Sequence, residues 1–146
     1  MAYIAEPGRG ITIHDVTRAF DGDTLYASMW DTNAWLIDMN GHVVWQWSME
    51  HPPAGHGKLL NNGSLLWQGR GEGSTGIAAA SGTELIEVDW DGRELWRYDD
   101  KFINHDFVRL ANGNTIINSN VFVPDAMLNH VKGGVAGTEA DGQIYS

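Results

Sequence analysis

The chain has 146 residues, no cysteine and a formal charge of −10 at pH 7. This length suits a single domain, and the lack of cysteine excludes disulfides and thiolate metal sites. The negative charge argues against nucleic acids and anionic membrane surfaces as partners, because both are bound by basic faces. Residues 1–10 lack the basic and apolar regions of a signal peptide, and no apolar run is long enough to span a membrane, so a cytoplasmic location is expected.

The first predicted unit consists of four short antiparallel strands, at residues 11–19, 24–30, 34–39 and 42–48. Asp21-Gly22 separates the first strand from the second, and Asn40-Gly41 separates the third from the fourth. Such pairs supply the positive φ angles that tight hairpin turns require. The unit is therefore expected to form a continuous antiparallel sheet.

The second unit repeats this plan, with strands predicted at residues 57–60, 64–68, 83–90 and 93–98. A glycine-rich insertion separates the second of these strands from the third. The third unit supplies two strands, at residues 105–111 and 114–122, and then becomes irregular.

A repeated motif connects the three units. It reads HDVTRAFDGDTLY from His14, HGKLLNNGSLLW from His56 and HDFVRLANGNTII from His105. The second copy is one residue shorter before its Asn-Gly. Each copy reads as a β-hairpin led by a histidine, so the repeat is interpreted as placing one histidine in each unit.

Four short strands repeated with a period of about 40–50 residues predict an all-β fold made of β-propeller blades. The blades would be residues 11–48, residues 56–98 and the start of a third at 105–146. The alternative is a sandwich of about ten strands, which has no reason to repeat its histidine-to-glycine spacing. Because an open stack of blades leaves an exposed edge, the chain is expected to belong to a longer protein, or else to assemble with copies of itself or another chain.

These motifs resemble those of the arylsulfate sulfotransferase-like β-propellers. The likeness rests on HDxxRLxNGNT, LIDxNGxVVWxW, EVDWDGxELWxY and GGxxGTExDG, and it runs from about Gly10 to the last residue. The resemblance implies a six-bladed propeller that moves sulfate from an aryl sulfate to a phenol without a nucleotide donor. It also implies that a histidine in the central channel carries the sulfate between the two substrates.

The first strand of each blade lines the channel of a propeller, so His14, His56 and His105 are expected to converge at one of its mouths. The resemblance favours His105 for the direct role, with His14 and His56 as acid/base or oxygen-binding partners. Arg109 and Asn104 are the candidate substrate-binding residues.

Purely structural roles for these residues stay open. Each histidine could cap its strand, and Arg109 could pair with Asp106. No cofactor is required, although three imidazoles also suit a divalent metal, and a non-catalytic or metal-binding propeller is the alternative function.

Overall fold

The computed structural model describes residues 14–74, 80–122, 124–128, 130 and 144–145, and their fold is all-β, as predicted. Sheet 1 contains β1 (Thr24–Ala27), β2 (Asn33–Ile37) and β3 (Val43–Ser48). Sheet 2 contains β4 (Pro53–Leu59), β5 (Leu65–Gly69), β6 (Glu84–Val88) and β7 (Glu94–Asp99). Sheet 3 contains β8 (Ile103–Arg109) and β9 (Thr115–Ser119). A short ladder joins β10 (Val121–Phe122) to β11 (Ile144–Tyr145), and α1 (Asp125–Leu128) is a single helical turn.

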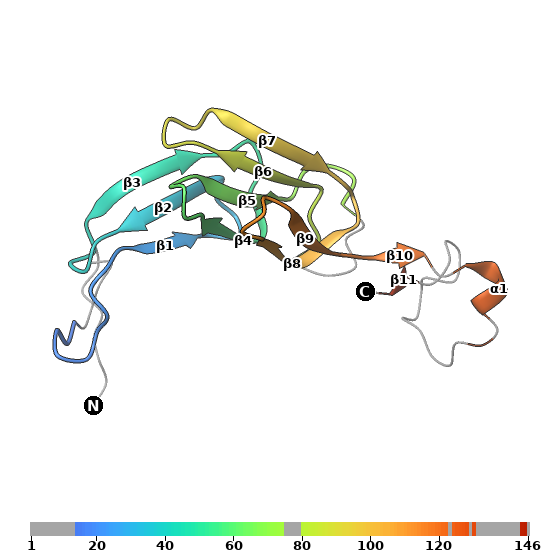
Figure 1. Cartoon of the computed structure of the whole chain (residues 1–146), viewed down its shortest axis with the longest axis horizontal. Helices are drawn as coiled ribbons and strands as arrows, with labels where there is room; N and C mark the ends of the chain where they lie inside the picture. The colour runs from blue at the N-terminus through green and yellow to red at the C-terminus, as the bar shows by residue number, and fades with distance from the viewer. Residues whose placement is uncertain (1–13, 75–79, 123, 129, 131–143, 146) are drawn as a thin grey trace.

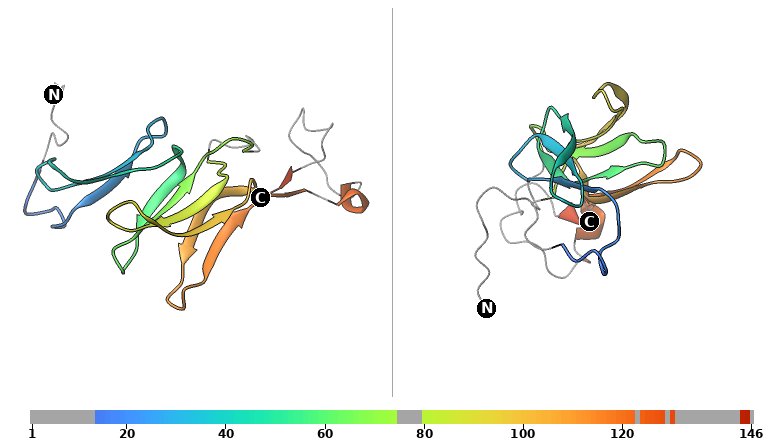
Figure 2. Two further views of the ribbon diagram at one scale, coloured as in Figure 1. Left: turned by 90° about the horizontal axis from the view of Figure 1, so that it is seen from above. Right: turned by 90° about the vertical axis from the view of Figure 1, so that its left-hand side faces the viewer.

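The three sheets lie side by side in chain order, as the left view of Figure 2 shows. Within each sheet the strands pair antiparallel with their neighbours in sequence. In Figure 1, β1, β4 and β8 run along one side of the molecule, and β3 and β7 run along the opposite side. Contacts of β4 with both β1 and β8 connect the sheets along the first of these sides. No helix among the described residues is long and apolar enough to cross a membrane.

The core consists of two apolar layers, one on each face of sheet 2. Because successive side chains of a strand point to opposite faces, Leu65 and Trp67 of β5 pack toward sheet 1 while Leu66 packs toward sheet 3. All five residues of β5 are buried for this reason. The sequence LLWQG therefore reads as a continuous buried run rather than an alternating one, as expected of a strand covered on both faces.

Four of the predicted turns form and share one geometry. At Gly63, for example, the glycine has φ of 88° and its amide donates to the Leu60 carbonyl, while the Leu60 amide donates to the Ser64 carbonyl. This is a type I turn closed by a left-handed glycine, so only the second residue of each Asn-Gly or Asp-Gly pair needs positive φ. The same pattern recurs at Gly41, Gly92 and Gly113.

The first predicted strand is wrong for the residues that can be seen, while residues 11–13 of that prediction lie outside the described ranges. Residues 14–19 form a turn, in which the Asp15 carbonyl accepts bonds from the amides of Arg18 and Ala19. Asp15 Oδ1 also accepts bonds from the amide and hydroxyl of Thr17, at 3.0 and 2.7 Å. Such local bonds offer the backbone an alternative to a ladder. Gly22 accordingly lacks the positive φ of the other turn glycines, and sheet 1 has three strands.

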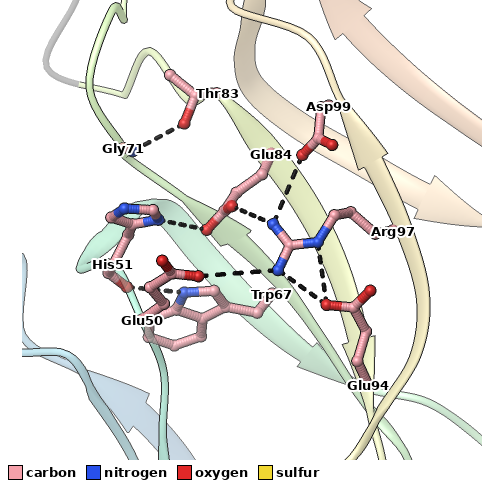
Figure 3. A network of polar contacts seen from close by, with 9 residues as sticks. All are labelled: Glu50, His51, Trp67, Gly71, Thr83, Glu84, Glu94, Arg97 and Asp99. Carbon is pink, nitrogen blue, oxygen red and sulfur yellow. Dashed lines mark hydrogen bonds and ion pairs between the residues drawn. The ribbon is translucent and has the colours of Figure 1, made fainter.

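An ion network joins the connection between sheets 1 and 2 to the outer part of sheet 2 (Figure 3). The carboxylate of Glu84, whose side chain is 5% exposed, contacts Arg97 Nη1 at 2.6 Å and His51 Nδ1 at 2.8 Å. Arg97 also donates to Glu94, and that hydrogen bond together with the charge of Glu84 raises the pKa of the Arg97 guanidinium. His51 therefore contacts a buried carboxylate.

Substituting Arg97 with leucine is expected to lower the free energy of unfolding by about 2–3 kcal/mol, because Glu84 would stay buried without its main counter-charge. The matched control is Arg93→Leu, which removes an arginine that is 78% exposed and paired with Asp89. Its expected cost is about 1 kcal/mol or less. Urea unfolding of both variants measures the difference, and equal costs would contradict a stabilising role for the network.

Candidate functional site

The inner strands of sheets 2 and 3 each carry an irregular step. In the pairing of β4 with β5, residues 54–56 lie opposite Gln68 alone. In the pairing of β8 with β9, residues 104–106 lie opposite Asn118 alone. These two bulges sit at equivalent places, and β4 and β8 contact each other. Bulges redirect side chains and are frequent beside functional sites.

The strand register at the two bulges shows that His56 and His105 are not equivalent residues, so this part of the prediction from the repeat is wrong. His56 corresponds to Asp106 and Gly55 to His105, because Pro53 and Ile103 precede the bulges while Gly57 and Phe107 follow them. The repeat therefore does not place one equivalent histidine in each unit.

His56 lies at the junction of the two strands. Its ring stacks on Phe107 of β8 at a centroid distance of 4.8 Å, and its Nε2 lies 3.4 Å from Asp106 Oδ1. Lys58 also reaches β8, where its Nζ contacts Asp106 at 3.1 Å and the Phe107 carbonyl. Burial of the ring, reinforced by the charge of Lys58 and opposed by that of Asp106, lowers the pKa of His56. His56 is thus a neutral imidazole beside an ammonium group at neutral pH.

Substitutions at Lys58 and Asp106 are expected to shift the pKa of His56 in opposite directions. Lys58→Met should raise the pKa of His56, because the repelling charge is lost. Asp106→Asn should lower this pKa further, because the carboxylate that favours the imidazolium is lost. An NMR titration of the His56 ring protons measures both shifts, with Lys101→Met as the control expected to leave the pKa unchanged. Shifts of the same sign in the two variants would contradict this geometry.

His105 occupies the bulge of β8 in an unusual backbone conformation. Its φ of 58° is the only positive value outside glycine in the described ranges. Histidine is among the residues that tolerate this region best, but the conformation costs energy and is concentrated at functional sites. The His105 amide donates to the Ala80 carbonyl at 3.1 Å, and the residue is exposed. The backbone is therefore tied down while the residue faces solvent.

His105 lies between the buried side chain of Asn104 and the backbone of Gly55. Asn104 is 4% exposed, its Oδ1 lies 2.5 Å from His105 Nδ1, and its Nδ2 donates to Asn120 Oδ1 at 3.0 Å. On the other side, a Cβ atom at Gly55 would lie 2.8 Å from the His105 carbonyl oxygen and 3.0 Å from Gln68 Oε1. Only glycine therefore lets the two bulges pack this closely.

His14 and Arg109, the other two predicted site residues, lie apart from the cluster formed by His56, Lys58, His105 and Asp106. His14 is exposed and precedes the turn at Asp15, and within the described ranges no hydrogen bond, ion pair or ring contact links it to His56 or His105. Arg109 lies on β8 but pairs with Glu87 at 2.7 Å and covers the Trp96 ring at 4.5 Å. The predicted pairing of Arg109 with Asp106 is wrong, because Lys58 and His56 occupy that carboxylate instead.

An open groove begins beside Lys58 and follows β4 and β8 to their turns. It has a volume of about 840 Å³, and its apolar wall includes Leu25, Leu60 and Val108. A smaller cleft of about 90 Å³ lies between β1 and β4 beside His56. The groove is large enough for an aromatic ligand.

Sequence reasoning placed neither Lys58 nor Asp106 in the site. Counting back from the turn glycines pairs Asp106 with His56, whereas nothing in the sequence marked Asn120 or Gln68. In the part of the chain that the structure describes, no three His, Cys, Asp or Glu side chains are grouped so as to hold a metal ion.

The chain matches no protein-family model, and a search of curated proteins gives no significant match.

Proposed function

We propose that this chain forms part of a β-propeller whose channel transfers sulfuryl groups from aryl sulfates to phenols through a histidine. The observation that carries the proposal is the meeting of the two bulges, which gathers His56, Lys58 and His105 on the adjoining strands β4 and β8. Sulfuryl transfer needs an unprotonated nucleophile, a base and a cation for the charged oxygens. The cluster contains one group of each kind.

His105 is the proposed nucleophile, since it is exposed and stands on a fixed, strained backbone. A lone pair of its imidazole attacks the sulfur, the bond between sulfur and the aryl oxygen breaks, and a phenolate leaves. In the second half of the reaction, the oxygen of the acceptor phenol attacks the same sulfur, and the bond between sulfur and nitrogen breaks. The imidazole of His105 is thereby regenerated.

We assign proton transfer to His56 and stabilisation of negative charge to Lys58. The lowered pKa of His56 keeps it neutral, so it can take the proton of the acceptor phenol and return that proton to the phenolate released in the next cycle. The Lys58 ammonium stabilises the sulfate oxygens and the departing phenolate. The groove that begins at Lys58 supplies an apolar wall for the aromatic ring.

Incubation of the complete propeller with a chromogenic aryl sulfate and a phenol tests this function. The expected result is release of the chromogenic phenol together with formation of the sulfated acceptor. Absence of both products across several donors would exclude the function. The 146-residue chain alone should show no turnover, because most of the channel wall would be missing.

The isolated chain should also associate or precipitate. In the described part of the chain β9 pairs with β8 alone, and the apolar side chains of Leu95, Ile116 and Val121 are exposed. Unpaired strand edges beside apolar side chains promote association. Light scattering is expected to show species larger than the monomer, and a stable, folded monomer would contradict this expectation.

A further inference from the structure

We propose that Asn120 acts through Asn104 to fix the tautomer of His105, so that Nε2 is the nitrogen that reacts. The use of Nε2 in sulfuryl transfer rests on the proposed function, whereas the tautomer itself does not. Asn120 would therefore be a positioning residue, separated from the substrate by two side chains.

The argument begins with the orientation of the Asn104 amide. Asn104 Nδ2 donates to Asn120 Oδ1 at 3.0 Å, which leaves Asn104 Oδ1 facing His105 Nδ1 at 2.5 Å. An amide oxygen can only accept a hydrogen bond. His105 Nδ1 must therefore carry the proton, and in the neutral ring the lone pair then lies on Nε2.

Burial makes the hydrogen bond between the Asn104 and Asn120 amides costly to break. Asn104 and Asn120 are 4% and 3% exposed, so water cannot replace a lost partner at little cost. Turning the Asn104 amide by half a rotation would set its NH₂ group against His105 Nδ1 and its oxygen against Asn120 Oδ1. With the Asn120 amide in its present orientation the second contact joins two acceptors, so Asn120 opposes turning of the Asn104 amide alone.

The backbone of His105 supports the same arrangement. Its amide is held by the Ala80 carbonyl, and its carbonyl oxygen lies against Gly55. With φ at 58°, the ring projects beside its own neighbour Asn104 rather than along a regular strand. Nδ1 is engaged in this contact, so Nε2 is the ring nitrogen left to meet a ligand.

The test is nitrogen NMR of the His105 ring in the complete propeller, at about pH 8.5, where ordinary imidazoles are neutral. Wild type is expected to show the proton mainly on Nδ1. In Asn120→Leu the Asn104 amide is free to turn, and the proton should move mainly to Nε2. The matched control Asn114→Leu changes an exposed asparagine at the turn between β8 and β9 and should leave the tautomer as in wild type.

A wild-type ring protonated mainly on Nε2 would overturn the inference, even if Asn120→Leu failed to fold. A ring unchanged in folded Asn120→Leu would also overturn it. In the complete propeller, Asn120→Leu should lower kcat by about 10–100-fold, as expected for loss of a residue that orients a reactive group. An Nδ1-protonated ring in a protein without sulfuryl transfer would refute the proposed function alone.

Discussion

Replacing His105, the proposed nucleophile, with alanine is expected to lower the rate of the proposed sulfuryl transfer by about 10³-fold or more, because the covalent route disappears with this side chain. His56→Ala should have a smaller effect, about 10²-fold, since it removes a proton acceptor but leaves the nucleophile. Initial rates of phenol release from a chromogenic aryl sulfate, at saturating acceptor, give both numbers.

The matched control is His42→Ala. His42 lies at the turn before β3, its side chain is 77% exposed, and its ring contacts Asp38 within the same turn. This variant should retain the wild-type rate. A rate unaffected by His105→Ala would remove His105 from the mechanism, and loss of activity in all three variants would point to a general effect on folding.

Replacing Trp67 with alanine is expected to lower the free energy of unfolding by about 3–5 kcal/mol. Trp67 is fully buried between sheets 1 and 2, and its Nε1 donates to the His51 carbonyl at 3.2 Å. The substitution leaves a cavity at the centre of the larger core cluster. Urea unfolding followed by circular dichroism measures the loss.

Trp30→Ala is the matched control for this loss. Trp30 is 85% exposed and contacts the Arg70 guanidinium at 5.3 Å from its ring centroid. A stacked cation of this kind contributes about 1 kcal/mol at most at an exposed site. A similar loss of stability in the two variants would contradict the assignment of Trp67 to the core.

The strands and their turns were predictable because two independent signals coincide. Leu65, Leu66 and Trp67 form an apolar run, and Asn62-Gly63 precedes it with the residue type that a left-handed turn position requires. The structure places β5 within one residue of the prediction. Apolar runs bounded by turn glycines identify hairpins whenever both strands are packed against a neighbour.

The prediction of the first strand failed because sequence similarity does not reveal local hydrogen bonds that compete with strand pairing. His14 and Asp15 match His105 and Asp106 letter for letter, but Asp15 binds the Thr17 amide and hydroxyl and closes a turn. In the third copy the position of Thr17 is Val108, which has no hydroxyl. The two copies therefore share a motif and differ in backbone.

The sequence contains the correct register of His56, but aligning the repeats on their histidines gives a wrong one. His56 lies seven residues before Gly63, and Asp106 lies seven residues before Gly113. Counting from the turns would have paired them, because hairpin register is fixed by the turn. Contacts such as Asn104 with Asn120, or Glu84 with His51, join distant segments through single side chains and leave no periodic signal.

His105 is proposed to carry the sulfuryl group between the two substrates. This role is tested most directly by mixing the complete propeller with an aryl sulfate in the absence of a phenol acceptor, quenching at alkaline pH and mapping the adduct by peptide mass spectrometry. The account predicts a mass increase of one sulfuryl group on the peptide that contains His105, lost again when a phenol is added before quenching. An adduct on His56 or His14 instead, or none at all while the enzyme turns over, would contradict it.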